Sequence, residues 1–86
     1  MIQVRRRRLT NRNKIYTPGS ETTVSLNYSP VYEVLEVEFS GNKVYHYLHV
    51  KPQVWEDYQK TVRLGGSSGS FVNEHIKPNY ELVRIE

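Results

Sequence analysis

The residues with the clearest potential for chemistry are the basic ones near the start of the chain. Half of the twelve Lys and Arg residues precede the first acid, Glu21, namely Arg5, Arg6, Arg7, Arg8, Arg12 and Lys14. Residues 1–14 therefore carry +6, and residues 15–86, with six bases and nine acids, carry −3. Guanidinium groups bind phosphates through paired hydrogen bonds, and such binding weakens as salt rises. The charge pattern predicts a cationic segment that stays free to meet a nucleic acid; its alternative is a solvated or acid-paired edge.

Two tyrosines could bind nucleic-acid bases, in addition to the phosphate binding expected of the basic residues. Tyr45 and Tyr47 alternate with His46, so their rings share one face of a predicted strand. Exposed aromatic rings stack unpaired bases, at about 1 to 3 kcal/mol per base. Glu36 and Glu38 are their expected neighbours and would repel a phosphate chain unless the arginines compensate. The alternative is a cross-strand ladder or a pair of core rings.

A glycine- and serine-rich loop over residues 65–70 is the second candidate site. Successive backbone amides at the start of a helix can bind anions, although no lysine follows the last glycine as in a nucleotide-binding loop. A flexible loop capped by Ser70 is the alternative. The residues of this candidate ligand loop are Ser68, Gly69, Ser70, Phe71, Asn73 and His75.

The histidines and acids do not form a catalytic or metal-binding pattern. His46 and His49 are three residues apart, which places them on opposite faces of a strand. No base stands beside a nucleophile, and the chain has no Cys to supply a thiolate. We therefore expect a non-catalytic protein without a metal or cofactor.

Hydrophobic periodicity predicts the elements that position these residues. Period-two alternation favours strands over residues 22–28, 34–39, 43–50 and 80–85, and three- and four-residue spacing after Pro52 favours a helix over residues 52–63. A second short helix is expected over residues 71–76, before Pro78. The predicted fold class is α+β: a three- to four-stranded antiparallel sheet with one main helix packed on one face and a second short helix.

The register of the central hairpin decides where the tyrosines point. A two-residue turn at Gly41-Asn42 pairs Phe39 with Val44 and places both rings on the outer face. A three-residue loop would shift the pairing by one residue and turn both rings into the core. We favour the two-residue turn.

The same residues carry a family resemblance. The sequence Val44-Tyr45-His46-Tyr47, the Val50-Lys51-Pro52 segment and the later Ser67, Gly69, Phe71, Asn73, Ile76, Lys77 and Tyr80 resemble the pattern of KTSC domains. This module is named for the C-terminus of some lysyl-tRNA synthetases and also occurs as free-standing bacterial and phage proteins. The resemblance spans about residues 22–85, so residues 22–86 are assigned to a KTSC-like domain and residues 1–21 to a basic arm or edge strand with a linker. It implies a module of unknown activity for which RNA binding has been suggested.

Together these observations predict a small cytoplasmic module that binds RNA or another nucleic acid without catalysis. The basic residues of the first 14 positions would contact phosphates, and Tyr45 and Tyr47 would orient bases. The alternative is an accessory protein that forms a homo-oligomer or binds a host protein or a small anionic ligand. Such a protein could be encoded by a phage. No apolar run approaches the roughly 20 residues that span a bilayer, so we expect no membrane partner.

Overall fold

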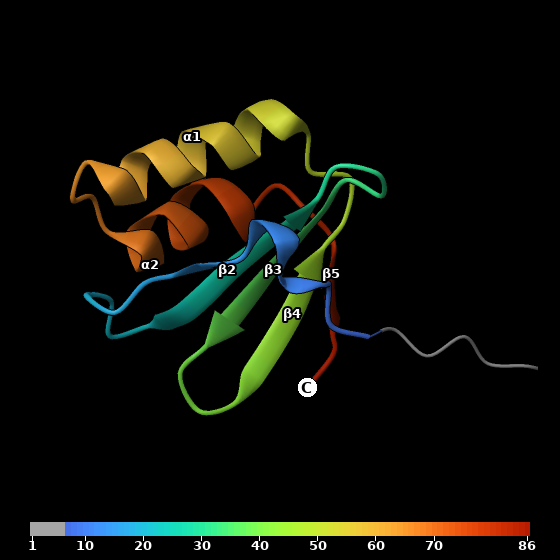
Figure 1. Ribbon diagram of the computed structural model, residues 1–86, viewed down its shortest axis with the longest axis horizontal. Helices are drawn as coiled ribbons and strands as arrows, with labels where there is room; N and C mark the ends of the chain where they lie inside the picture. Colours follow the sequence, from blue (N-terminus) through green and yellow to red (C-terminus); the bar gives the residue numbers. More distant parts are fainter. Residues whose placement is uncertain (1–6) are drawn as a thin grey trace, which may run out of the picture.

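The protein folds as a five-stranded antiparallel sheet with its longer helical segments on one face, as seen in a computed structural model that describes residues 7–86 (Figure 1). Neighbouring strands in the sheet follow chain order: β1 Ile15–Tyr16, β2 Thr23–Ser29, β3 Val34–Phe39, β4 Lys43–Tyr47 and β5 Leu82–Arg84. The helices are the 3₁₀ helix η1 Asn11–Asn13, α1 Pro52–Arg63, α2 Ser68–Phe71 and the π-helix η2 Val72–Ile76. The predicted α+β class is confirmed, and the two-residue strand β1, which was not predicted, raises the strand count above the predicted three or four.

The main helix, α1, has the bounds that the sequence predicts. Pro52 occupies the first turn, where its missing N–H costs nothing, and Gly65 follows the end with a φ of 85°. Trp55 and Tyr58 are its buried residues. The ring of Trp55 stacks on Tyr28 of β2 at a centroid distance of 5.5 Å, which fixes the helix on the sheet.

The second helical segment turns through α2 into η2 and closes the same face. Its cap is Ser67, whose Oγ accepts a hydrogen bond from the Ser70 N–H at 3.1 Å, and not Ser70 as predicted. Phe71 stacks on Tyr58 at 4.4 Å, and Val72 and Ile76 are fully buried. The two helical segments therefore share one apolar core with the sheet.

The favoured register of the β3–β4 hairpin was wrong. Phe39 pairs with Lys43 and Leu35 with Tyr47, so the loop has three residues, with Gly41 and Asn42 both in the left-handed region. Since a shift of one residue exchanges the faces of a strand, Tyr45 and Tyr47 now face the helices. This register turns two large rings toward the helices, and the favoured one would have turned the smaller Val44 and the polar His46 there in their place.

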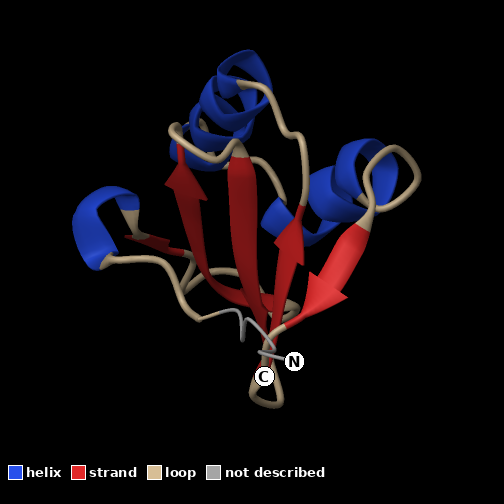
Figure 2. Ribbon diagram, turned by 90° about the vertical axis from the view of Figure 1, so that its right-hand side faces the viewer, coloured by secondary structure: helices blue, strands red, loops and turns tan. Residues whose placement is uncertain are grey.

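The opposite face of the sheet is polar and is covered by the start of the chain. The hydrogen bonds of Leu9, Thr10 and Asn13 to β2 and β3 hold this segment on the sheet. Figure 2 shows the strands in red fanning out between helices in blue. Within residues 7–86, no helix is long and apolar enough to cross a bilayer.

Candidate functional site

An N-terminal strap, defined here as residues 7–14, crosses the outer face of β2 and β3. The Leu9 N–H donates to Glu36 Oε2 at 2.8 Å, and the Asn27 side chain donates to the Thr10 carbonyl at 2.8 Å. Near the end of the strap, the Asn13 side chain donates to the Tyr28 carbonyl at 2.9 Å. Polar groups of the sheet thus hold the backbone of the strap, because a buried donor or acceptor without a partner is costly.

Arg8 is the charged anchor of the strap. Its guanidinium lies 3.4 Å from Glu36 Oε1 and 3.2 Å from Glu38 Oε1, and its side chain is 29% exposed. Burial alone would lower the pKa of Arg8, but the charge of Glu36 and the hydrogen bond to Glu38 outweigh it and raise that pKa. The two carboxylates expected to repel a nucleic acid are therefore neutralised in part from within the chain.

Glu36 and His46 form a buried pair beneath Arg8. His46 Nε2 lies 2.8 Å from Glu36 Oε2, and the two side chains are 3% and 2% exposed. Burial would raise the pKa of Glu36, but the hydrogen bonds from His46 and the Leu9 amide, with the charge of Arg8, lower it overall. Glu36 is thus an ionised carboxylate inside the fold.

Three basic residues of the strap lie outside these ion pairs. Arg7 and Arg12 are exposed, and Lys14 is half-buried. The Lys14 ammonium lies 5.1 Å from the centre of the Tyr16 ring, within cation–π range, and Tyr16 itself is 65% exposed. This group of Arg7, Arg12, Lys14 and Tyr16 is called the basic surface below.

The expectation of a free cationic segment is wrong for Arg8, which folds onto the acidic body. The basic residues at Arg7, Arg12 and Lys14 are separate from those ion pairs. Arg5 and Arg6, which belonged to the same prediction, lie outside the described residues. Of the described basic residues in this segment, Arg8 is therefore paired within the fold, and the other three lie outside those ion pairs.

The tyrosines predicted to stack bases do not form a platform. Tyr47 has no exposed surface, and its burial raises its pKa to about 12. Within residues 7–86 its hydroxyl has no hydrogen-bond partner. Tyr45 is half-buried and meets Phe39 edge-on at 5.5 Å. Both rings serve the core, because the three-residue hairpin loop turned them inward.

The candidate ligand loop has a mainly structural role. Ser68 and Gly69 are buried, and a Cβ on Gly69 would lie 3.0 Å from Thr22 Oγ1, so this position favours glycine by close approach. Phe71 is half-buried and packs against Tyr58, and the ring of the more exposed His75 lies tilted against it with a centroid distance of 4.9 Å. Ser70 and Asn73 are exposed.

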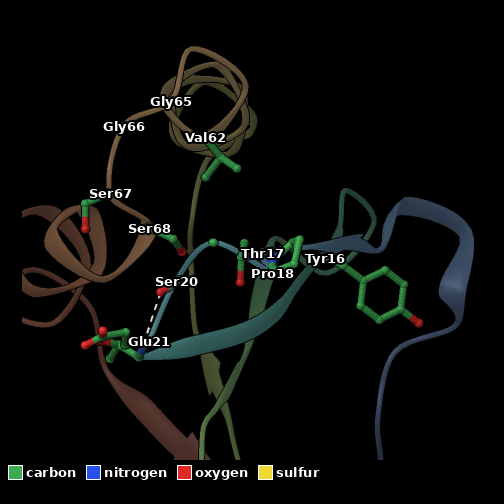
Figure 3. Close-up of a pocket in the computed structure, with 12 residues that line it drawn as sticks. Tyr16, Thr17, Pro18, Ser20, Glu21, Val62, Gly65, Gly66, Ser67 and Ser68 are labelled. Carbon is green, nitrogen blue, oxygen red and sulfur yellow. Dashed lines mark hydrogen bonds between the residues drawn. The ribbon is translucent and has the colours of Figure 1, made fainter.

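This loop lines one side of a cavity of about 610 Å³ whose other side is the loop over residues 16–22. Figure 3 shows Val62 and Ser68 directed into the gap, with the ring of Tyr16 turned away. Among residues 7–86, the lining includes the carboxylate-bearing Glu21 and no Lys, Arg or His. That charge balance does not favour a phosphate, so the predicted anion cradle has no electrostatic support here.

A chain of buried hydroxyls closes the floor between the two loops. Ser68 Oγ lies 2.8 Å from Tyr58 OH and accepts from Thr23 Oγ1 at 2.8 Å, and Thr23 Oγ1 lies 2.7 Å from Thr17 Oγ1. Thr17 can donate to Thr23, Thr23 donates to Ser68 and Ser68 to Tyr58, whose own proton goes to the Ser68 carbonyl, so every hydroxyl proton of the chain has an acceptor. The chain links α1, the ligand loop and β2, which accounts for the burial of Ser68.

A second cavity, of about 390 Å³, opens beside the strap and was not predicted from the sequence. It lies where β3 begins and β4 ends, and its lining consists of Arg7, Leu9, Tyr32, Val34, His46, Leu48 and His49. It is called the His46 cavity below. Among residues 7–86, no group of three or more His, Asp or Glu side chains could hold a metal ion.

Fold and side-chain arrangement define a small α+β domain whose sheet separates an aromatic core from a polar, strap-covered face. The chain belongs to the KTSC domain family, whose model matches residues 20–80. A protein of Tsukamurella paurometabola is 30% identical over 66 residues, which cover 77% of this chain and 92% of that protein. The crystal structure of a KTSC domain protein from Yersinia pestis matches with a TM-score of 0.69 and 27% identity, over 78% of this chain and 89% of that one. The predicted resemblance is confirmed.

Proposed function

We propose that this protein binds single-stranded nucleic acid, with RNA as the partner, through the basic surface of its N-terminal strap. The observation that carries the proposal is the placement of exposed Arg7 and Arg12 and half-buried Lys14 on a backbone that is hydrogen-bonded to the sheet. Cations carried on an anchored backbone need less ordering when they meet a phosphate chain than cations on a free segment would. An RNA partner also agrees with the cytoplasmic location expected from the sequence.

The internal ion pairs support this proposal by removing an obstacle. Glu36 and Glu38 lie under the strap, and Arg8 offsets their charge from inside. A phosphate chain at the surface therefore meets the outward cations before it meets an uncompensated carboxylate. Tyr16 takes over the stacking role first given to Tyr45 and Tyr47, because its ring is exposed and carries Lys14 beside it. We infer that the protein acts by binding alone.

Fluorescence anisotropy with a labelled uridine oligonucleotide tests this proposal. The triple variant R7Q/R12Q/K14Q removes three phosphate contacts and should flatten the slope of log affinity against log salt by about 2, since each contact to a single strand contributes about 0.7. The measurement compares salt concentrations from about 50 to about 200 mM.

A matched control keeps net charge from explaining the result. The variant K60Q/R63Q/R84Q removes the same number of charges from exposed sites on α1 and β5. It should retain most of the wild-type salt slope. Equal losses in both triple variants, or no binding by the wild-type protein, would refute nucleic-acid recognition by the strap.

An interaction with a protein is the second candidate function. Val31 and Tyr32, in the turn between β2 and β3, are 81% and 75% exposed, an uncommon display of two adjacent large apolar residues. A homo-oligomer formed through this turn should weaken in the variant V31S. Sedimentation velocity over a range of protein concentrations would detect it, and a monomer at all concentrations excludes self-association as the role of this turn.

A further inference from the structure

The His46 cavity combines apolar side chains with the buried imidazole of His46. Leu9 comes from the strap, Val34 from the start of β3 and Leu48 from the end of β4. The exposed ring of Tyr32 stands at its rim. Its volume of about 390 Å³ falls within the range of small-molecule sites, which pair apolar walls with a few placed polar groups.

The hydrogen bond to Glu36 fixes the chemistry of the His46 ring. Glu36 already accepts hydrogen bonds from the Leu9 amide and from Arg8, so it is ionised and has no proton to donate. His46 must therefore donate from Nε2, which is 2.8 Å from the carboxylate. In the neutral ring, Nδ1 is then an acceptor, and it makes no hydrogen bond to another atom of residues 7–86. Because His46 lines the cavity, Nδ1 is the acceptor that this ring can offer to a ligand there.

The rim adds a positive charge and a rigid backbone. Arg7 lines the cavity, and no carboxylate among residues 7–86 lies within ion-pair distance of it. The carboxylate of Glu33, next to Tyr32, is bonded by Lys51 at 3.0 Å. Glu33 and His49 both adopt left-handed backbone conformations, and the Val50 N–H donates to the Glu33 carbonyl at 2.8 Å. Such backbone geometry in non-glycine residues is unfavourable and tends to occur at binding sites.

We propose that the His46 cavity receives one unpaired base of the bound strand, with Tyr32 stacking on its face, His46 Nδ1 accepting an N–H from its edge, and Arg7 contacting the adjacent phosphate. The inference rests on the proposed function and adds a base-reading site to it. A base matches this cavity because it combines a flat aromatic face, an N–H donor and a negative charge one sugar away.

Replacing the stacking ring is the first test. The variant Y32A should weaken binding of a uridine oligonucleotide of about ten residues by about fivefold or more, the loss expected for one stacked base. Tyr32 is exposed, so the fold should be unaffected. The matched control is V31A, which changes an equally exposed neighbour that does not line the cavity and should bind as the wild type does.

Methylation of the ligand tests the hydrogen bond separately from charge. An oligonucleotide of N3-methyluridine has the same phosphates as its parent but no N–H donor on the base. It should bind the wild-type protein about three- to tenfold more weakly, the effect of one lost hydrogen bond. The nitrogen NMR signal of His46 Nδ1 should shift when the unmodified oligonucleotide is added and stay in place with the methylated one.

The outcomes separate the two proposals. If R7Q/R12Q/K14Q loses the salt slope while Y32A, methylation and the His46 signal show no effect, the strand binds the strap and the cavity inference is wrong. If the wild-type protein binds neither oligonucleotide, the proposed function fails, and the cavity inference fails with it. Weaker binding by Y32A, a shifted His46 signal and a penalty for methylation together support the cavity.

Discussion

The two faces of the sheet are stabilised by different physical means. The helix-covered face is aromatic: Tyr28 stacks on Trp55, and Tyr58 stacks on Phe71. The strap-covered face is built from Ser25, Asn27, Glu36, Glu38 and His46, which alternate along the strands with the apolar residues. The first face is stabilised by the apolar area that it buries. The second is stabilised by hydrogen bonds that pair its buried donors with acceptors.

This difference shows on which face a buried polar group can lack a hydrogen-bond partner. On the apolar face, the hydroxyl of Tyr47 has no partner within residues 7–86, yet the ring is fully buried, because packing of the ring outweighs the loss. On the polar face, Glu36 receives hydrogen bonds from Arg8, Leu9 and His46. Removing one partner of a buried charge is costly, so the second face depends on a complete network.

The largest effect should come from deleting a core ring. Tyr47→Ala removes a fully buried side chain and leaves a cavity between β4 and the helices, at a cost of about 3 to 5 kcal/mol in the free energy of unfolding. Urea denaturation followed by circular dichroism measures it. Tyr32→Ala, at a 75% exposed site, is the control and should change stability by no more than about 0.5 kcal/mol. Equal effects in the two variants would contradict the assignment of Tyr47 to the core.

An intermediate effect is expected on the polar face. Glu36→Gln keeps the shape of the side chain but removes the charge that pairs with Arg8 and His46, and should cost about 2 kcal/mol at neutral pH. Because the pKa of Glu36 is lowered in the folded protein, its contribution is present above the ordinary value of 4.5 and is lost as the pH falls below it.

The acid limb of the stability profile provides the measurement. Denaturation midpoints of the wild type should fall as the pH drops from about 5 toward about 3, and the difference from Glu36→Gln should shrink over the same range. Glu56→Gln changes an exposed carboxylate on α1 and is the control. A difference between wild type and Glu36→Gln that does not depend on pH would show that the charge of Glu36 does not stabilise the fold.

The smallest effect should be a gain on the apolar face. Tyr47→Phe removes only the hydroxyl that lacks a partner, so stability should be unchanged or higher by up to about 1 kcal/mol. The pKa of Tyr47 is raised from 10.0 to about 12, so its contribution is present below 10.0 and is lost as the pH rises toward 12. The variant should lose less stability than the wild type over that alkaline range, and a destabilised Tyr47→Phe would reveal a partner for the hydroxyl.

The sequence predicts the elements of this fold better than their faces. Pro52, the spacing of Trp55 and Tyr58, and the glycines after Leu64 are local signals, and they place α1 correctly. The hairpin register depends on whether the turn contains two or three residues, and both alternatives fit the local pattern. Burial against the helices decides between them, and that information is absent from the hairpin itself.

The strap and the His46 cavity were beyond the sequence argument for the same reason. Leu9 and Arg8 meet Glu36 across separations of 27 and 28 residues, so no local periodicity reports the contact. The sequence did contain a signal. Glu36 and His46 lie within β3 and β4, which are interior strands of the sheet, and a buried charged side chain there requires a partner. The arginines before residue 14 are the residues that could supply this partner.

The position of Leu9 and Arg8 has a practical consequence for anyone trimming this protein. The family match begins at residue 20, whereas the hydrogen bonds that shield Glu36 come from residues 8 and 9. A fragment cut at the family boundary would leave an ionised carboxylate and its histidine facing solvent on a bare sheet. The segment needed for a stable fold therefore begins before residue 20, where the family match begins.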